Sequence, residues 1–190
     1  MSEPVLRAAA RPQLRLRTPG GEHRAQVETI LRDTAVFHDF EIDIAIEVFD
    51  AFLANPGQDY CALGAFTQDG SLVGYVCYGP TPCTTGTFDL YWIAVAPAAQ
   101  RTGTGTRLLQ EVERRLARSG ARLVLIETSS LPRYEATRTF YARRGYAVTA
   151  RVPDFYADGD DRLIFAKRIN ASDVRQTRQW KPGKTSFEEA

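Results

Sequence analysis

Two glycines one residue apart, Gly103 and Gly105, stand between a predicted strand and a predicted helix. Residues 90–95 are rich in β-branched and aromatic side chains, which are typical of strands. In residues 107–116 the apolar side chains recur on one helical face. Glycine at a helix start lets backbone N–H groups approach a ligand, and free N–H groups together with the helix dipole favour phosphate. The pattern therefore predicts a pyrophosphate-binding loop over residues 95–106.

The residues after the second glycine exclude two common nucleotide motifs. A dinucleotide-binding fingerprint needs a small residue three positions after Gly105, and that position is Leu108. No Lys-Ser or Lys-Thr pair follows the glycines, so the loop is not a P-loop. A tight turn that needs glycine for its geometry alone remains an alternative for the isolated motif. With Arg101 beside it, the loop suits the pyrophosphate of a molecule whose other parts bind elsewhere.

Length and composition narrow the class of protein. The chain has 190 residues, enough for one domain with a substantial core, and a formal net charge of +1 that favours neither nucleic acid nor a membrane surface as a partner. Its three cysteines lack C-x-x-C spacing, which argues against a disulfide framework or a metal site and favours a cytoplasmic location. Arg7 and Arg11 interrupt any secretory signal, and no apolar run is long enough to span a membrane.

Hydrophobic periodicity and turn residues predict alternating strands and helices. Strands are expected over residues 13–17, 60–66, 72–78, 87–95, 122–128, 146–152 and 162–168. Helices are expected over 22–34, 41–54, from the glycine loop to Ser119-Gly120, and over 132–144 before Gly145. An acidic, aromatic loop is expected over 153–161. We expect a flexible lead-in over 1–12, a single domain over 13–169 and a tail over 170–190.

Three segments together resemble a known family. Gln100-Arg101-Thr102-Gly103-Thr104-Gly105 resembles the Gln/Arg-x-x-Gly-x-Gly/Ala signature of the GNAT-type N-acetyltransferases. Residues 90–97 resemble the fourth strand of that family, and residues 140–146 resemble its Phe-Tyr-x-x-x-Gly-Phe element. The resemblance implies an α+β fold: a three-layer arrangement around a mixed, mostly antiparallel sheet of about seven strands. Helices are expected on both faces of this sheet, with a splay between strands 4 and 5.

The same resemblance implies acetyl-CoA as the co-substrate, bound where strands 4 and 5 separate, and no metal. Ile93 and Val95 would offer backbone groups to the pantetheine arm. The residues that would bind the pyrophosphate through backbone N–H groups are Gln100, Arg101, Gly103, Gly105 and Thr106. The family often has an asparagine seven residues before its catalytic tyrosine, but Tyr134 stands there in this chain. No cofactor contact is therefore assigned to that position.

Acetyl transfer to an amine requires a neutral amine and a protonated or stabilised thiolate. The resemblance assigns the proton donor to Tyr141, since a phenol with a pKa near 10 keeps its proton at neutral pH. The alternative is that Tyr141 is a core aromatic. Asp89 and Glu127 are the candidate bases, and the alternative is a structural role for each carboxylate. An amine that arrives neutral needs no base.

Acidic and aromatic residues suggest the nature of the acceptor. The helix stripe of Asp43, Glu47 and Asp50 is interpreted as a solvated face. The loop residues Asp154, Asp158, Asp160 and Asp161 surround Phe155 and Tyr156 and would attract a cationic amine. We therefore expect a small-molecule or amino-acid-like amine as the acceptor. The alternative is an acyl-CoA sensor of the same fold without turnover, and a homodimer is expected by family analogy alone.

Overall fold

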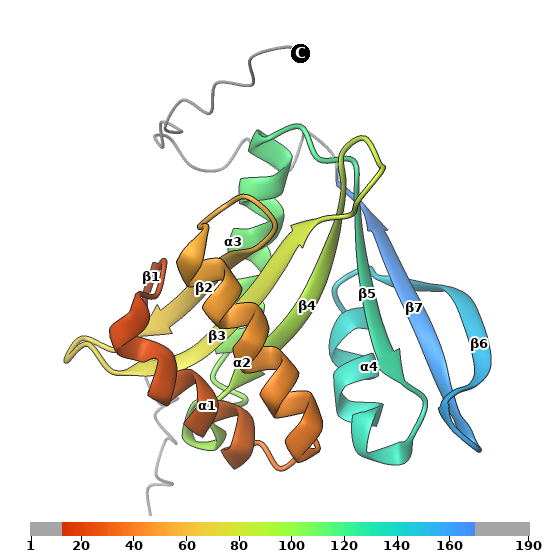
Figure 1. The fold of residues 1–190 in the computed structure, drawn as a ribbon, viewed down its shortest axis with the longest axis horizontal. Helices are drawn as coiled ribbons and strands as arrows, with labels where there is room; N and C mark the ends of the chain where they lie inside the picture. The colour runs from red at the N-terminus through yellow and green to blue at the C-terminus, as the bar shows by residue number, and fades with distance from the viewer. Residues whose placement is uncertain (1–12, 170–190) are drawn as a thin grey trace, which may run out of the picture.

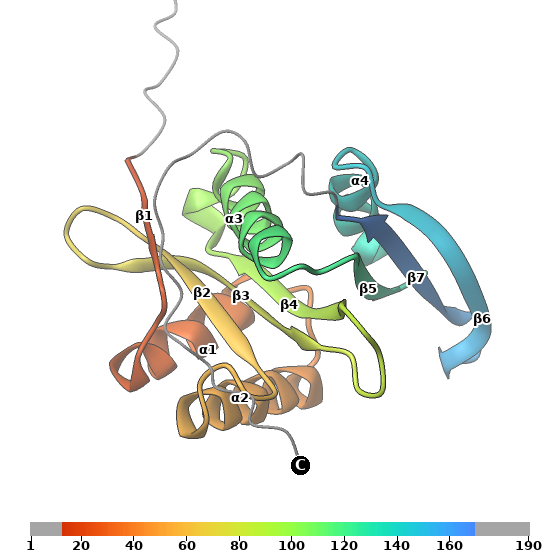
Figure 2. The same ribbon diagram turned by 90° about the horizontal axis from the view of Figure 1, so that it is seen from above.

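The computed structural model describes residues 13–169, so the expected lead-in (1–12) and tail (170–190) lie outside the described residues. One twisted sheet runs through the molecule, with helices on both of its faces (Figure 1). Seen from above, α1 and α2 cover one face while α3 and α4 cover the other (Figure 2). This arrangement confirms the expected fold class.

The sheet has seven strands in the order β1-β2-β3-β4-β5-β7-β6. They are β1 (Arg15–Arg17), β2 (Cys61–Phe66), β3 (Leu72–Pro80), β4 (Thr87–Val95), β5 (Leu123–Ser129), β6 (Ala147–Ala157) and β7 (Asp160–Arg168). Neighbouring strands are antiparallel except for the β4–β5 pair, which is parallel. The sheet is therefore mixed and mostly antiparallel, as expected.

The four α-helices are α1 (Arg24–Asp33), α2 (Asp39–Ala54), α3 (Thr104–Arg118) and α4 (Glu135–Ala142). Short 3-10 turns precede α1, α3 and α4 at Gly21–His23, Pro97–Ala99 and Pro132–Tyr134. Just after α3 and α4 the chain reaches Gly120 and Gly145, whose φ angles are +81° and +82°. Only glycine adopts this left-handed conformation freely, and Gly120 follows α3 where the sequence predicts its end. Helix α4 ends at Ala142, two residues before the predicted end at residue 144. No helix within residues 13–169 combines the length and apolarity needed to cross a membrane.

Each face of the sheet has its own apolar core. The predicted stripe of α3 is buried against one face through Leu108, Leu109, Val112 and Leu116. The other core contains Val27 and Ile30 of α1 with Phe49 of α2, packed on Tyr75 of β3. Because the helices are anchored on both faces by these cores, strands β2, β3 and β4 form a rigid base for the loop before α3.

Strands β4 and β5 pair only over their first halves. Residues 87–90 of β4 align with residues 123–126 of β5, and the pairing stops there. At the same level, Tyr91 is an extra residue in the register with β3, because Leu90 and Trp92 face consecutive residues of that strand. Such a bulge bends a strand and increases its twist. The two strands therefore diverge after Leu90, which confirms the expected splay.

The predicted loop over residues 153–161 is wrong, because β6 continues to Ala157 and β7 begins at Asp160. Pro153 suggests a break in the strand, but β6 is an edge strand, where a missing N–H group need not weaken a ladder. The register is irregular between Val152 and Ala157, and the carboxylate of Asp161 accepts a hydrogen bond from the Asp154 backbone N–H at 3.0 Å. The acidic and aromatic residues of this segment therefore lie on a bulged hairpin.

The buried stripe of α3 should carry much of the stability. Val112→Ala should lower the free energy of unfolding by about 2 kcal/mol, because it removes two methyl groups from a fully buried site. Val148→Ala is the matched control, since Val148 of β6 is 53% exposed, and it should change the stability by less than about 0.5 kcal/mol. Urea denaturation of both variants tests this, and equal losses would contradict the assigned core.

Candidate functional site

The second half of β4 leaves one edge unpaired toward the gap. The Ala96 backbone N–H donates to the Val73 carbonyl at 3.0 Å, so Ala96 faces β3. The Val95 carbonyl instead accepts a hydrogen bond from the Gln100 side chain at 3.1 Å, on the other side of the strand. Because successive residues of a strand alternate, the backbone groups of Ile93 and Val95 face the gap. These are the two residues expected to hold the pantetheine arm.

The loop before α3 needs each of its glycines for a different reason. Gly103 is the N-cap of α3 and has a φ of +93°, a conformation in which other residues are strained. At Gly105 a Cβ would meet the ring of Phe140 at 3.3 Å, so the absent side chain permits close packing of α3 against α4. The first N–H groups of α3 are left without intrahelical partners. The loop therefore has the donors that a phosphate requires.

A cavity of about 900 Å³ lies between this loop and α4, and we call it the cofactor cavity. All of the predicted cofactor residues except Ile93 line it, namely Val95, Gln100, Arg101, Gly103, Gly105 and Thr106. Its charged lining consists of Arg101, Arg133, Glu135, Arg143 and Arg144. The excess of arginine suits the phosphates of a coenzyme A molecule, which are negatively charged.

The arginines at the end of α4 were missed from the sequence. The Arg144 guanidinium lies 3.6 Å from the centre of the Phe140 ring and donates to the Phe140 carbonyl at 2.6 Å. It also donates to the hydroxyl of Thr106 on α3. Arg144 thereby joins α4 to the glycine loop. The pair Arg143-Arg144 before Gly145 is visible in the sequence, but only the fold shows which loop it faces.

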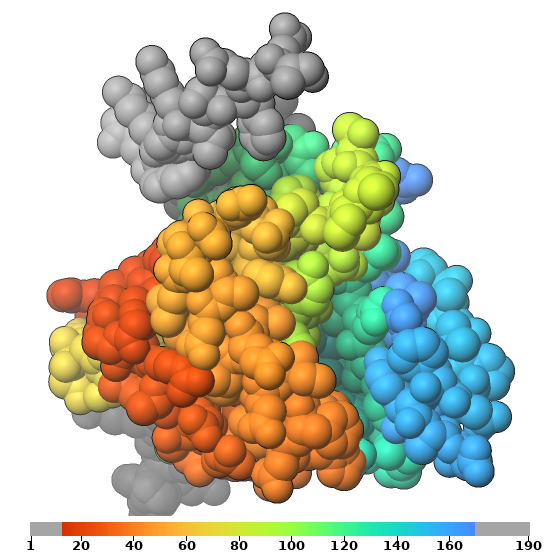
Figure 3. Space-filling model, in the orientation of Figure 1, coloured from red at the N-terminus to blue at the C-terminus, as the bar shows by residue number. Residues whose placement is uncertain are grey.

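A second cavity of about 750 Å³ lies on the other side of the gap, and we call it the acceptor cavity. Its walls come from α2, β4, β5, the start of α4 and the β6–β7 hairpin. It contains Ile93 and all three predicted catalytic residues, Tyr141, Asp89 and Glu127. Arg133 lines both cavities, so the two adjoin there. Figure 3 shows the molecular surface hollowed between α2 and the β6–β7 hairpin.

Tyr141 is both a core residue and a cavity residue. Its side chain is 3% exposed, and its ring packs against Phe140, Tyr146 and Phe165 with centroid distances of 5.4–6.0 Å. Its hydroxyl makes no hydrogen bond within residues 13–169, although the residue lines the acceptor cavity. Burial raises the pKa of Tyr141 well above the ordinary value of a phenol. The side chain therefore holds a proton that no described residue shares.

The two candidate bases differ in their partners. The Asp89 carboxylate accepts a hydrogen bond from the Thr81 hydroxyl at 2.8 Å and makes no ion pair within the described part of the chain. The Glu127 carboxylate forms an ion pair with Arg162 of β7 and is 39% exposed. Both side chains reach the acceptor cavity from neighbouring strands, β4 and β5.

A pair of residues at the far wall of the acceptor cavity was missed from the sequence. The Tyr134 hydroxyl lies 3.2 Å and 3.3 Å from the two carboxylate oxygens of Glu41 on α2. Burial and the charge of Glu41 raise the pKa of Tyr134, so its hydroxyl donates. Glu41 also accepts a hydrogen bond from the His38 backbone N–H at 2.8 Å. In the sequence, Tyr134 stands out only because the family often has asparagine at its position. Glu41 stands out only because its position near a helix start suits a capping residue.

The predicted acidic groups divide into two sets. Tyr156, Asp158 and Asp160 of the β6–β7 hairpin line the acceptor cavity. Asp161 does not line it. The hydrogen bond from the Asp154 N–H, together with the ion pair with Arg151, lowers the pKa of Asp161. On α2, Asp43 and Glu47 are exposed, while Asp50 pairs with Arg24 at 2.7 Å. The helix stripe is therefore a solvated face, as interpreted from the sequence.

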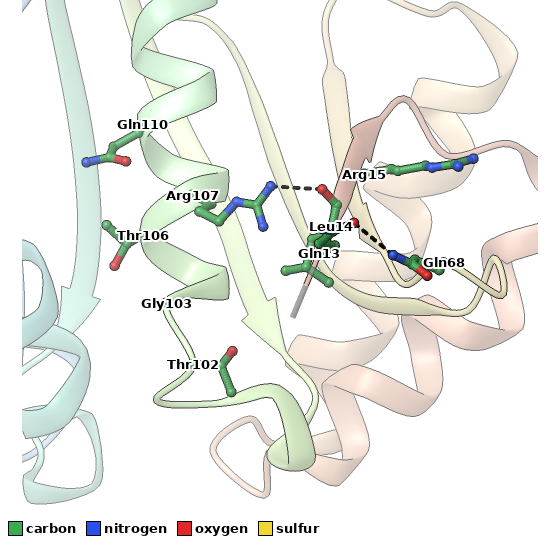
Figure 4. Close-up of a pocket in the computed structure, with 9 residues that line it drawn as sticks. All are labelled: Gln13, Leu14, Arg15, Gln68, Thr102, Gly103, Thr106, Arg107 and Gln110. Carbon is green, nitrogen blue, oxygen red and sulfur yellow. Dashed lines mark hydrogen bonds between the residues drawn. The ribbon is translucent and has the colours of Figure 1, made fainter. Parts of the chain in front are cut away.

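A third cavity, of about 750 Å³, lies beside the N-terminal half of α3 (Figure 4). Hydrogen bonds from Gln68 to Gln13 at 2.9 Å and from Arg107 to the Leu14 carbonyl at 2.8 Å hold β1 and the β2–β3 turn at its wall. Its lining includes Gly103 and Thr106 of the predicted cofactor set but none of the predicted catalytic residues. Within residues 13–169 no cluster of His, Cys, Asp or Glu is arranged to hold a metal ion.

Comparisons with known proteins decide the family. The sequence profile of the acetyltransferase (GNAT) family matches residues 25–146. The chain belongs to the GNAT family. A GNAT-family protein from Desulfovibrio desulfuricans is 38% identical, with a TM-score of 0.78 over 83% of this chain and 99% of that chain. No match was found among curated proteins.

More distant solved structures share the GNAT fold. The ribosomal-protein-S18-alanine N-acetyltransferase of Escherichia coli is 19% identical, with a TM-score of 0.66 over 83% of this chain and 95% of that chain. The PaiA N-acetyltransferase of Thermoplasma acidophilum, solved with coenzyme A, is 19% identical, with a TM-score of 0.63 over 82% of this chain and 99% of that chain. At these sequence identities the similarity shows a shared fold and nothing more.

The glycine loop of this GNAT chain should be sensitive to a side chain at Gly103. Gly103→Ala should destabilise the fold by about 1–2 kcal/mol and weaken coenzyme A binding roughly tenfold, because strain in the loop moves its N–H donors. Gly57→Ala is the control, since Gly57 has a φ of +86° and equally open surroundings but lies outside both cavities. Calorimetric titration with coenzyme A should show weaker binding for Gly103→Ala alone, and equal binding by both variants would contradict the assignment.

Proposed function

We propose that this GNAT-family chain transfers an acetyl group from acetyl-CoA to a primary amine of a small molecule or amino-acid-like acceptor. Acetyl-CoA, when bound, supplies an activated acetyl thioester. The observation that carries the proposal is the meeting of two cavities at the gap between β4 and β5, with the unpartnered phenol of Tyr141 beside it. Related structures solved with coenzyme A, an aminoglycoside 6'-N-acetyltransferase and the Thermoplasma protein, support the cofactor part.

The two substrates reach the gap from opposite sides, and each side suits the charge of its own substrate. The open backbone edge at Ile93 and Val95 and the N–H donors of the glycine loop bind the elongated, anionic thioester from the α3–α4 side. The acceptor amine reaches the same gap from the opposite cavity. Holding both reactants in one geometry converts a collision between two molecules into a step within one complex. The reaction therefore proceeds in a ternary complex by direct attack.

Tyr141 is the proposed acid. As the amine nitrogen forms its bond to the carbonyl carbon and the carbon–sulfur bond breaks, the Tyr141 hydroxyl donates its proton to the sulfur. The raised pKa of the buried phenol keeps this proton in place throughout the neutral range. Because no described residue accepts a hydrogen bond from the hydroxyl, it is available to the departing sulfur.

Asp89 is the proposed base. Protonating Glu127 would disrupt its ion pair with Arg162, whereas Asp89 has no cationic partner within residues 13–169. Asp89 lies on β4 close to the bulge at Tyr91, and both residues line the acceptor cavity. It is therefore the better placed of the two carboxylates to accept the proton of an incoming ammonium group, directly or through a water molecule.

The acceptor is proposed to be small because its cavity is closed on several sides by α2, β4, β5 and the β6–β7 hairpin. A cytoplasmic location belongs to the same proposal, since acetyl-CoA is an intracellular metabolite and the three cysteines are free. The competing function is a sensor that binds acyl-CoA without turnover. Thiol release from acetyl-CoA in a screen of amines distinguishes the two, because only the enzyme releases the thiol.

Removing the Tyr141 hydroxyl should slow the reaction without harming the fold. Tyr141→Phe should lower kcat about 100-fold while leaving the affinity for coenzyme A unchanged, since it removes a general acid. Tyr146→Phe is a matched control, because Tyr146 is equally buried and in ring contact with Tyr141 but lines neither substrate cavity. Steady-state thiol release measures both, and equal rates for wild type and Tyr141→Phe would refute the acid assignment.

Substitutions of the two candidate bases, Asp89 and Glu127, should have different effects on the rate in the same assay. Asp89→Asn should lower kcat/KM about 100-fold near neutral pH and less at high pH, where the amine is already neutral. Glu127→Gln should have a clearly smaller effect, because Glu127 is held by Arg162. A pH profile of kcat/KM for both variants provides the measurement. A larger loss for Glu127→Gln would exchange the two roles.

A further inference from the structure

The two cavities that meet at the gap carry opposite charges. Five carboxylates line the acceptor cavity: Glu41, Asp89, Glu127, Asp158 and Asp160. The one arginine or lysine among its lining residues is Arg133, which stands at the boundary with the cofactor cavity. Of the five carboxylates, only Glu127 is in an ion pair with a described residue. The cavity therefore has more negative charge than a single ammonium group would balance.

One arginine lies near Glu41, because the Arg133 guanidinium is hydrogen-bonded to the His38 ring and lies 5.4 Å from the centre of the Tyr134 ring. The groups that hydrogen-bond the Glu41 carboxylate itself are neutral. Its hydrogen bonds come from a neutral phenol, Tyr134, and a backbone N–H, that of His38. It is partly buried and makes no ion pair within residues 13–169. Three aromatic side chains, Phe37, Phe40 and Trp92, line the same cavity. An ammonium group bound at Glu41 would form an ion pair with the carboxylate and could contact aromatic rings of the same cavity.

Glu41 also lies away from the reacting end of the cavity. Its partner Tyr134 precedes Tyr141 by seven residues, which is about 10 Å along a helix axis. The unpartnered phenol of Tyr141, 3% exposed, marks the end where the acetyl group is transferred. Asp89 serves that same end from β4. A cation bound at Glu41 is therefore a different group from the nitrogen that is acetylated.

We propose that the acceptor carries at least two amino groups and that Glu41 binds the ammonium group that is not acetylated. This inference rests on the proposed acetyltransferase function. In the complex, one amine loses its proton near Asp89 and is acetylated, while the second keeps its charge and pairs with Glu41. Tyr134 is a positioning residue, because its hydroxyl donates to the Glu41 carboxylate and holds it toward the cavity. Straight-chain diamines and polyamines are the chemical class that fits.

The test compares diamines with monoamines of the same length. Diamines from diaminobutane to diaminooctane and the corresponding alkylamines are assayed for thiol release with acetyl-CoA. The wild type should prefer its best diamine by at least tenfold in kcat/KM, the range expected of a hydrogen-bonded charge pair. Glu41→Gln should abolish most of that preference through a higher KM for the diamine, with the monoamine unaffected. Glutamine keeps the acceptor for Tyr134 and the capping bond, so the fold is preserved.

Asp43→Asn is the matched control, since Asp43 is an exposed carboxylate of the same helix and does not line the cavity. It should leave both amine classes unchanged. The inference would be overturned if the wild type had equal kcat/KM values for diamines and monoamines, or if Glu41→Gln kept the preference for diamines. Either result would leave acetyl transfer intact. If no amine releases the thiol, acetyl transfer itself fails. Calorimetric binding of diaminohexane to the coenzyme A complex then decides, because binding lost in Glu41→Gln supports the inference and absent binding overturns it.

Discussion

The separation of β4 from β5 is the constraint on which the rest of the site depends. The strands pair over residues 87–90 and 123–126, and the bulge at Tyr91 turns β4 away beyond that point. Backbone groups that leave a sheet must find other partners, since unpaired polar groups are costly when buried. The side chain of Gln100 donates a hydrogen bond to the Val95 carbonyl. The neighbouring backbone groups on the same edge of β4 are left for a ligand. The binding edge is thus made from hydrogen-bonding capacity that the sheet leaves unused.

The gap can stay open because the packing around it does not depend on β4–β5 pairing. On one face α3 and α4 bury Leu108, Val112 and Tyr141 in a shared core with β5 and β7, and on the other face α1 and α2 have a core of their own. Close-packed interiors resist deformation, so the helices hold the strands apart. The two sides of the gap also differ in charge, with arginines near the glycine loop and carboxylates near α2. In the proposed reaction, the anionic thioester and the cationic amine would each approach the side of opposite charge.

Local patterns in the sequence predict the elements and the cofactor half of the site. The stripe of α3, the glycines after two helices and the Gly-x-Gly loop are all set by neighbours in the chain, so periodicity and turn chemistry reveal them. The hairpin of β6 and β7 was misread because Pro153 breaks a central strand but not an edge strand. The contact of Tyr134 with Glu41 joins residues 93 positions apart, which no local rule can indicate. Several residues of the acceptor cavity were thus visible in the sequence, but its Tyr134–Glu41 wall required the fold.

That long-range contact depends on the same gap. Helices α2 and α4 cover opposite faces of the sheet (Figure 2), where a continuous sheet would keep their side chains apart. Tyr134, just before α4, reaches Glu41 of α2 because β4 and β5 have already diverged at that level. Asparagine, common at this position in the family, has a much shorter side chain than tyrosine. The longer phenol joins the two helix layers across the opening. The divergence that leaves the edge of β4 at Ile93 and Val95 unpaired therefore also allows the contact that forms one wall of the acceptor cavity.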